Sequence, residues 1–141
     1  MSSDRKKIVF DTSSLIPVCL HPTREPAQIF KRAVMDHELF SSPETLRELQ
    51  LVLTRDKFEA WQPLVQRIAW ARLYQDVTIS IAPQDSVTDC RDVKDNKFLE
   101  LAIAANADII ISSDIHLLEL HPYHGIEIIK LSEFKLKYHQ D

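Results

Sequence analysis

The sequence has a single glycine, Gly125, in 141 residues, where an average composition would supply about ten. This scarcity excludes the P-loop and the dinucleotide-binding G-x-G-x-x-G loop, because each motif needs at least two glycines. If the protein handles phosphate, it must do so without a glycine-rich backbone loop.

Cysteines are few, and long hydrophobic runs are missing. The two cysteines, Cys19 and Cys90, lack the spacing of a zinc site and are interpreted as reduced thiols. No run approaches 18 apolar residues, and the apolar run at 8–10 is too short for a signal peptide. We therefore expect a cytoplasmic protein that does not associate with membranes.

What the sequence does contain is an alternation of strand and helix patterns. Short apolar or alternating runs predict strands at 8–10, 38–41, 77–81, 109–111 and 127–129. Apolar residues at helical spacing predict helices at about 27–34, 43–53, 60–74, 94–105, 115–120 and 133–138. This order predicts one α/β domain over residues 1–141, with three α/β/α layers and a mainly parallel sheet of about five strands. Residues 1–6 and 139–141 are expected to be frayed.

The predicted helix at 60–74 has a row of apolar residues that indicates a buried face. The row consists of Trp61, Leu64, Val65 and Ile68. Trp70 lies off this row, and we assign it to the core or to ordinary surface rather than to a partner contact.

Aspartates follow two of the predicted strands. Asp11 directly follows the strand at 8–10, and Asp114 follows the strand at 109–111 after two serines. Functional sites of parallel sheets form at the carboxyl ends of the strands, so we expect these two side chains at one edge. Asp114 could equally cap the next helix. Asp11 is harder to explain structurally, because a buried carboxylate is costly unless it is paired or binds a metal.

Further acids lie near the predicted helices. Asp92 and Asp95 are three residues apart, so both point to one side of a helical turn, although they could simply complement the helix dipole. Glu48 lies beside the apolar face of its helix, whereas Glu44 belongs to a solvated face. Clustered carboxylates repel one another, and a hard divalent cation such as Mg²⁺ or Mn²⁺ removes that conflict. We therefore interpret the set as an acidic metal site.

Five stretches of the chain, taken in order, resemble the PIN-domain ribonucleases of the toxin-like branch (VapC-like), the toxins of toxin–antitoxin pairs. They are IVFDT at 8–12 with Leu15, SSPE at 41–44 with Glu48 and Leu49, CRDVKDNKFL at 90–99, ADIIISSD at 107–114, and the pair 128–129 leading to 133–134. Each motif is short, but the ordered set spans nearly the whole chain.

The resemblance implies a PIN-like fold and a metal-dependent endoribonuclease. Its catalytic and metal-binding acids would be Asp11, Glu48, Asp95 and Asp114, with Asp92 as an auxiliary metal ligand. One or two Mg²⁺ or Mn²⁺ ions would promote hydrolysis of RNA phosphodiester bonds. The resemblance also implies an RNA substrate, a cognate antitoxin that occupies the acidic groove, and a homodimer.

The chain departs from the family pattern in two places. The family usually has asparagine two residues after its first aspartate, where this chain has Ser13, and Ser112 and Ser113 replace the usual residues before the last aspartate. Ser13 leaves open a catalytically weak or inactive PIN-like module that binds RNA or protein. The same serine argues against a haloacid-dehalogenase-type phosphatase, which needs a second aspartate at that position.

The net charge of −4 depends on the candidate site. Without its five acids, the chain has 16 acidic and 17 basic residues. The basic residues that we expect to position RNA phosphates are Arg24, Arg91, Lys94 and Lys97. Three histidines near the C-terminus, His116, His121 and His124, lack the spacing of a zinc site and are interpreted as surface residues.

Overall fold

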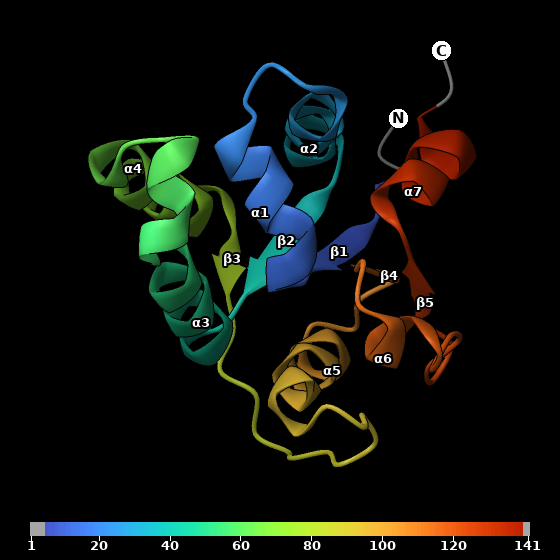
Figure 1. Cartoon of the computed structure of the whole chain (residues 1–141). Helices are drawn as coiled ribbons and strands as arrows, with labels where there is room; N and C mark the ends of the chain where they lie inside the picture. Colours follow the sequence, from blue (N-terminus) through green and yellow to red (C-terminus); the bar gives the residue numbers. More distant parts are fainter. Residues whose placement is uncertain (1–4, 140–141) are drawn as a thin grey trace.

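Five parallel strands form a central sheet with helices on both faces (Figure 1). The computed structural model describes residues 5–139. The strands are β1 (Lys7–Phe10), β2 (Glu38–Ser41), β3 (Ile79–Ser80), β4 (Ile109–Ile111) and β5 (Glu127–Ile129). Their order in the sheet is β3-β2-β1-β4-β5, and every neighbouring pair is parallel. The predicted α/β class and parallel sheet are confirmed.

The helices divide between the two faces of the sheet. They are α1 (Thr12–Leu20), α2 (Glu25–Asp36), α3 (Pro43–Leu53), α4 (Leu64–Val77), α5 (Asn96–Ala104), α6 (Ile115–Leu118) and α7 (Leu131–Tyr138), with 3-10 turns η2 (Asp56–Ala60) and η3 (Val93–Asp95). Successive strand residues face opposite sides. Ile8 and Phe10 therefore pack with α1, α2, α3, α4 and α7, whereas Val9 packs with α5 and α6.

Helix α1 is absent from the sequence-based prediction. It contains Pro17, and its apolar residues show no clear amphipathic period because most of the helix is buried. The start of α1 is fixed by Asp11, whose Oδ1 accepts a hydrogen bond from the Ser14 N–H at 2.9 Å. The residue that ends β1 therefore also begins the next helix.

The prediction for the helix at 60–74 is wrong about its buried face. Helix α4 begins only at Leu64 and continues through Val77, so β3 keeps only two residues of the strand predicted at 77–81. The apolar row of Trp61, Leu64, Val65 and Ile68 is exposed. The buried side of the helix lies next to this row, and it consists of Arg67, Ala71 and Tyr74. Apolar periodicity does not identify this face, because one of its buried residues is the charged Arg67. Trp70, half-buried, stacks on Tyr74 with ring centroids 5.7 Å apart.

Arg67 is the largest fully buried side chain, with 1% of its surface exposed. Its guanidinium donates to the backbone carbonyl oxygens of Leu53 at 2.6 Å, Arg55 at 3.1 Å and Gln62 at 2.9 Å. It also donates to Glu59 Oε1 at 2.6 Å. One side chain thereby joins the end of α3, the η2 turn and the start of α4.

Replacing Arg67 by methionine should lower the free energy of unfolding by about 3 kcal/mol, because it leaves buried carbonyl oxygens without donors. Urea unfolding of the two proteins measures the difference. Arg72→Met, on the exposed side of the same helix, is the matched control and should change stability by less than about 0.5 kcal/mol. Equal losses in both variants would contradict the structural role of Arg67.

The chain ends were predicted to be frayed at residues 1–6 and 139–141. Residues 1–4 and 140–141 lie outside the described residues. Among the described residues near the two ends, the Lys6 N–H donates to His37 Nδ1 at 2.9 Å, and His139 is buried. Among residues 5–139, no helix is long and apolar enough to cross a membrane. Cys19 and Cys90 are both free and buried.

Candidate metal centre

The strand order reverses at the centre of the sheet, where β1 and β4 are neighbours. Such a reversal leaves a crevice at the carboxyl ends of the strands. Asp11 follows β1 there, and its N–H donates to the Ile111 carbonyl at the end of β4 at 3.0 Å. Asp114 follows β4 as the N-cap of α6. The topology thus brings together two acids separated by about a hundred residues in sequence.

Asp11 is buried, with 2% of its surface exposed. Besides the Ser14 N–H, its carboxylate accepts from Ser13 Oγ at 2.8 and 2.9 Å and from Ser112 Oγ at 2.5 Å. Burial raises the pKa of Asp11, and these hydrogen bonds act in the opposite direction. Two of the three serines at which the sequence departs from the family pattern, Ser13 and Ser112, therefore hold the first aspartate.

Three further carboxylates converge with one another, and two of them, Asp95 and Asp114, line the same pocket as Asp11. Asp92, Asp95 and Asp114 each offer a ligand atom, and these atoms lie within 4.8 Å of one another. Asp95 is 5% exposed, and its Oδ2 is buried without a hydrogen-bond partner among the described residues. Burial and the neighbouring Asp114 carboxyl raise the pKa of Asp95 to about 7. A buried carboxylate oxygen without a donor, close to two other carboxylates, fits a divalent cation.

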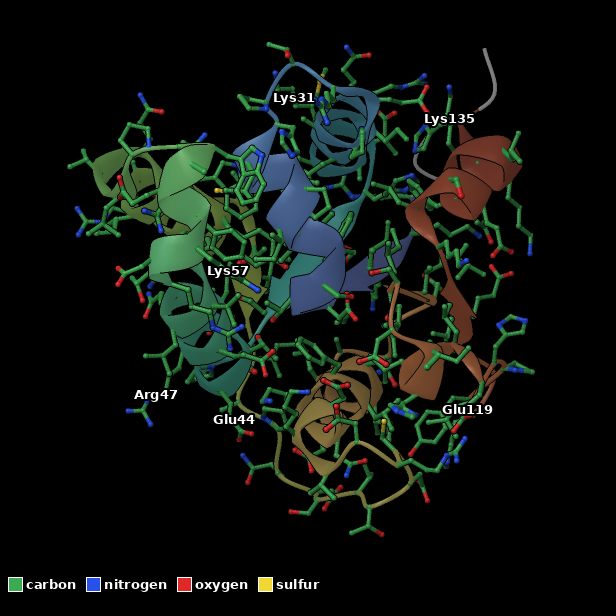
Figure 2. All side chains as sticks on the ribbon, in the orientation of Figure 1. Lys31, Glu44, Arg47, Lys57, Glu119 and Lys135 are labelled. Carbon is green, nitrogen blue, oxygen red and sulfur yellow. The ribbon has the colours of Figure 1, made fainter. Side chains whose placement is uncertain are left out.

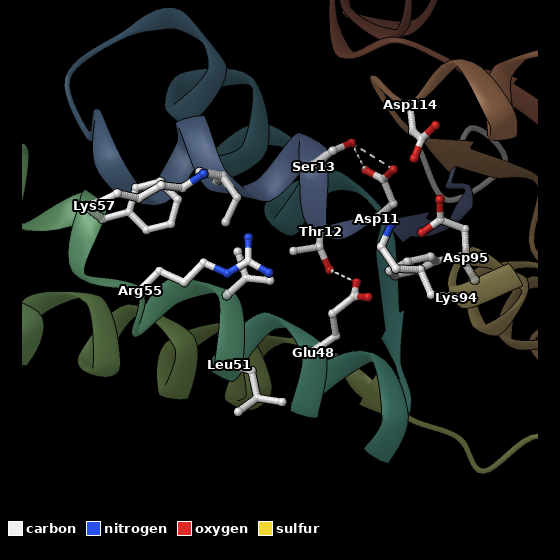
Figure 3. Close-up of a pocket in the computed structure, with 14 residues that line it drawn as sticks. Asp11, Thr12, Ser13, Glu48, Leu51, Arg55, Lys57, Lys94, Asp95 and Asp114 are labelled. Atoms are coloured by element: carbon white, nitrogen blue, oxygen red, sulfur yellow. Dashed lines mark hydrogen bonds between the residues drawn. The ribbon is translucent and has the colours of Figure 1, made fainter. Parts of the chain in front are cut away.

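Asp114 caps helix α6 and also lies in the three-acid cluster. Its Oδ1 accepts from the His116 N–H at 2.8 Å, which caps α6, and its carboxyl also belongs to the three-acid cluster. Ser112 Oγ accepts from the Asp114 N–H at 2.9 Å while donating to Asp11. In Figure 3 the carboxylates of Asp11, Asp95 and Asp114 point toward one another.

Glu48 lies on a different wall of the same pocket. Its Oε1 accepts from Thr12 Oγ1 at 2.6 Å, as drawn in Figure 3, and its Oε2 accepts from Lys97 Nζ at 2.9 Å. Glu44, one turn earlier on α3, is exposed and projects outward in Figure 2. The structure therefore separates the two glutamates as expected, but it places Glu48 with a lysine rather than in the three-acid cluster.

Four of the five candidate acids line a pocket of about 480 Å³, and Asp92 lies outside its lining. Asp11, Glu48, Asp95 and Asp114 all contribute to it. The opposite wall carries the exposed side chains of Arg55 and Lys57, which sequence reasoning missed (Figure 3). No local motif marks these residues, because they reach the pocket only through the turn after α3 that Arg67 holds.

The basic residues expected to position RNA phosphates are mostly engaged elsewhere. Arg91 is paired with Glu119 through two hydrogen bonds of 2.7 and 2.8 Å. Lys94 lines the pocket, but its ammonium donates to Asp92 Oδ2 at 2.6 Å and lowers the pKa of that carboxyl. Lys97 pairs with Glu48, and Arg24 lies in the exposed turn before α2, outside the pocket lining.

Comparison of the sequence with known proteins gives a family match and a curated relative. A family model described as PIN domain matches residues 7–116. The uncharacterized protein MJ1680 of Methanocaldococcus jannaschii is 27% identical over 142 residues, covering 97% of this chain and 88% of that protein.

Several solved structures have a similar fold. PAE2754 from Pyrobaculum aerophilum matches with a TM-score of 0.64 at 11% identity, covering 96% of this chain and 90% of its own. VapBC2 from Rickettsia felis, bound to a DNA fragment from its promoter, matches with a TM-score of 0.61 at 14% identity. The match covers 86% of this chain and 96% of that chain. VapBC-1 from nontypeable Haemophilus influenzae matches with a TM-score of 0.60 at 15% identity. The match covers 89% of this chain and 98% of that chain. At these identities the likeness shows a shared fold.

Proposed function

This chain belongs to the PIN domain family, and we propose that it is a divalent-metal-dependent endoribonuclease that hydrolyses RNA phosphodiester bonds. The observation that carries the proposal is the convergence of Asp95 and Asp114 beside Asp11 at the carboxyl edge of the sheet. The unpartnered, buried Oδ2 of Asp95 supports a cation at this place.

The residues that would hold Mg²⁺ or Mn²⁺ are Asp11, Asp95 and Asp114, with Asp92 beside them. A bound divalent cation would make a water molecule more acidic and stabilise negative charge developing on phosphate. Ser13 and Ser112 keep the Asp11 carboxylate oriented by donating to its oxygens. Glu48 lines another wall of the same pocket and orients Thr12 at the start of α1.

Positive charge on the far wall of the pocket supports a nucleic-acid substrate. Arg55 and Lys57 line the pocket, and neither side chain forms an ion pair within residues 5–139. Phosphate groups of nucleic acids are commonly positioned by arginine and lysine. We therefore assign the positioning of the RNA backbone to Arg55 and Lys57 rather than to Arg91.

RNA cleavage assays with Mn²⁺ or Mg²⁺ test the proposed function. We expect cleavage that stops in EDTA and returns when excess Mn²⁺ is added. Asp11→Asn should lower the rate at least about 100-fold, although the asparagine can still cap α1. Glu44→Gln, an exposed acid on α3, is the control and should cleave at the wild-type rate. Cleavage that persists in EDTA would contradict the mechanism, and an inactive protein that binds RNA would instead identify a binding module.

We also propose that the chain is the toxin of a toxin–antitoxin pair and binds a small antitoxin protein. The VapBC structures with the same fold support this partnership. Expression of the chain alone should arrest growth, and co-expression of the product of a small neighbouring gene should restore it. Growth arrest by Asp11→Asn would contradict a toxin that acts by RNA cleavage.

A homodimer is our remaining proposal about partners. The exposed apolar row of Trp61, Leu64, Val65 and Ile68 supports it, because apolar patches on soluble proteins commonly mark interfaces. Light scattering after size exclusion measures the oligomeric state directly.

A further inference from the structure

An ion pair is built into the wall of the acid pocket. Lys97 Nζ lies 2.9 Å from Glu48 Oε2, and the two side chains are only 11% and 18% exposed. The residues are 49 positions apart, so the pair joins α5 to α3. Lys97 also donates to the backbone carbonyl of Lys94 in η3. The ammonium therefore has fixed partners on two elements of the site.

The other oxygen of Glu48 is occupied as well. Thr12 Oγ1 donates to Glu48 Oε1 at 2.6 Å, and Thr12 is the first residue of α1, directly after Asp11. With one oxygen held by a hydroxyl and the other by an ammonium, Glu48 already has the donors that a buried carboxylate needs. It contrasts with Asp95, whose Oδ2 is buried and has no partner among the described residues.

The five acids of the site thus divide into two classes. Glu48 and Asp92 each have a lysine partner, Lys97 and Lys94 respectively. The remaining three, Asp11, Asp95 and Asp114, form no ion pair with lysine or arginine in the described part of the chain.

The charge of these three carboxylates determines how many cations the pocket can hold. When ionised they carry −3, and one divalent cation reduces this to −1. A second divalent cation would leave the three carboxylates with a net charge of +1, because Lys97 and Lys94 already neutralise Glu48 and Asp92.

We propose that the site binds a single divalent cation, and that the Lys97 ammonium stays paired with Glu48 whether or not the cation is bound. Glu48 is then a positioning residue that fixes Thr12 and the start of α1, and it is not a metal ligand. This inference rests on the proposed function, because it concerns the metal content of the same site.

Calorimetric titration of the full chain with Mn²⁺ in the absence of RNA tests the inference. Wild type should bind one equivalent. Glu48→Gln should change the dissociation constant for Mn²⁺ less than threefold, whereas Asp114→Asn should weaken binding at least tenfold. Lys97→Met should bind Mn²⁺ at least threefold more tightly or take up a second equivalent, because it leaves Glu48 free. Lys97→Arg keeps the charge and should behave like wild type.

Two equivalents in wild type, or a loss of affinity in Glu48→Gln of threefold or more, would overturn the single-cation site. Lys97→Met binding one equivalent with wild-type or weaker affinity would overturn the role of Lys97. Circular dichroism establishes that each variant is folded, and the wild-type stoichiometry tests the inference even if a variant is not. A wild-type protein that binds no Mn²⁺ would refute the proposed function itself, a result distinct from two bound ions.

Discussion

Asp95→Asn is expected to abolish RNA cleavage while making the metal-free protein more stable. Asp95 is buried, and both burial and the adjacent Asp114 carboxyl raise its pKa to about 7. Above that pH the folded protein must hold a second negative charge at this place without a cation. Asparagine removes the charge, and its amide can donate to Asp114. We expect a gain of roughly 2 kcal/mol in the free energy of unfolding at pH 8 in EDTA.

The same substitution removes a proposed metal ligand, so the rate of RNA cleavage should fall at least about 100-fold. Urea unfolding in EDTA and a cleavage assay in Mn²⁺ measure the two effects on one preparation. Asp92→Asn is the matched control, because Lys94 lowers the pKa of Asp92 and its charge is already compensated. Asp92→Asn should therefore be no more stable than wild type in EDTA. If Asp95→Asn were less stable than wild type in EDTA at pH 8, the acids would be structural rather than arranged for a cation.

Stability should respond to pH in opposite ways with and without a divalent cation. The pKa of Asp95 is about 7 in the folded protein, against about 4 in the unfolded chain. Between these values the folded state holds a proton that the unfolded state has released, so metal-free stability falls as pH rises. The raised pKa of Asp11 acts in the same direction. We expect a loss of roughly 2 kcal/mol between pH 4 and 7.5 in EDTA.

A divalent cation should reverse this trend, because it binds the ionised carboxylates and only in the folded state. At a Mn²⁺ concentration of about 100 times the dissociation constant, the stabilisation should be about 2.7 kcal/mol. Thermal unfolding at pH 5 and pH 7.5, in EDTA and in Mn²⁺, gives the four values needed. Identical pH dependence in both conditions would show that these carboxylates do not bind the metal.

The proximity of two acids of the candidate site could be predicted from the sequence. Asp11 and Asp114 follow buried strands, and parallel strands end at one edge, so no long-range contact had to be known to place them together. The sequence also indicated that Ser13 and Ser112 can form hydrogen bonds. That both donate to the Asp11 carboxylate could not be predicted, because it depends on the pairing of β1 with β4.

Other features could not be predicted because they depend on contacts distant in sequence. Glu48 and Lys97 are 49 residues apart, and no local sequence pattern predicts that they form a pair. The buried face of α4 was misread because its centre is Arg67, which the carbonyl oxygens of Leu53 and Gln62 satisfy. Helix α1 was missed because Pro17 and nearly continuous apolar residues obscure its period.

The sheet order has a consequence for synthesis of the protein. β1 at the N-terminal end pairs with β4, and the pocket needs side chains from residue 11 to residue 114. A chain emerging from the ribosome therefore has no acid pocket until β4 and Asp114 have left the exit tunnel.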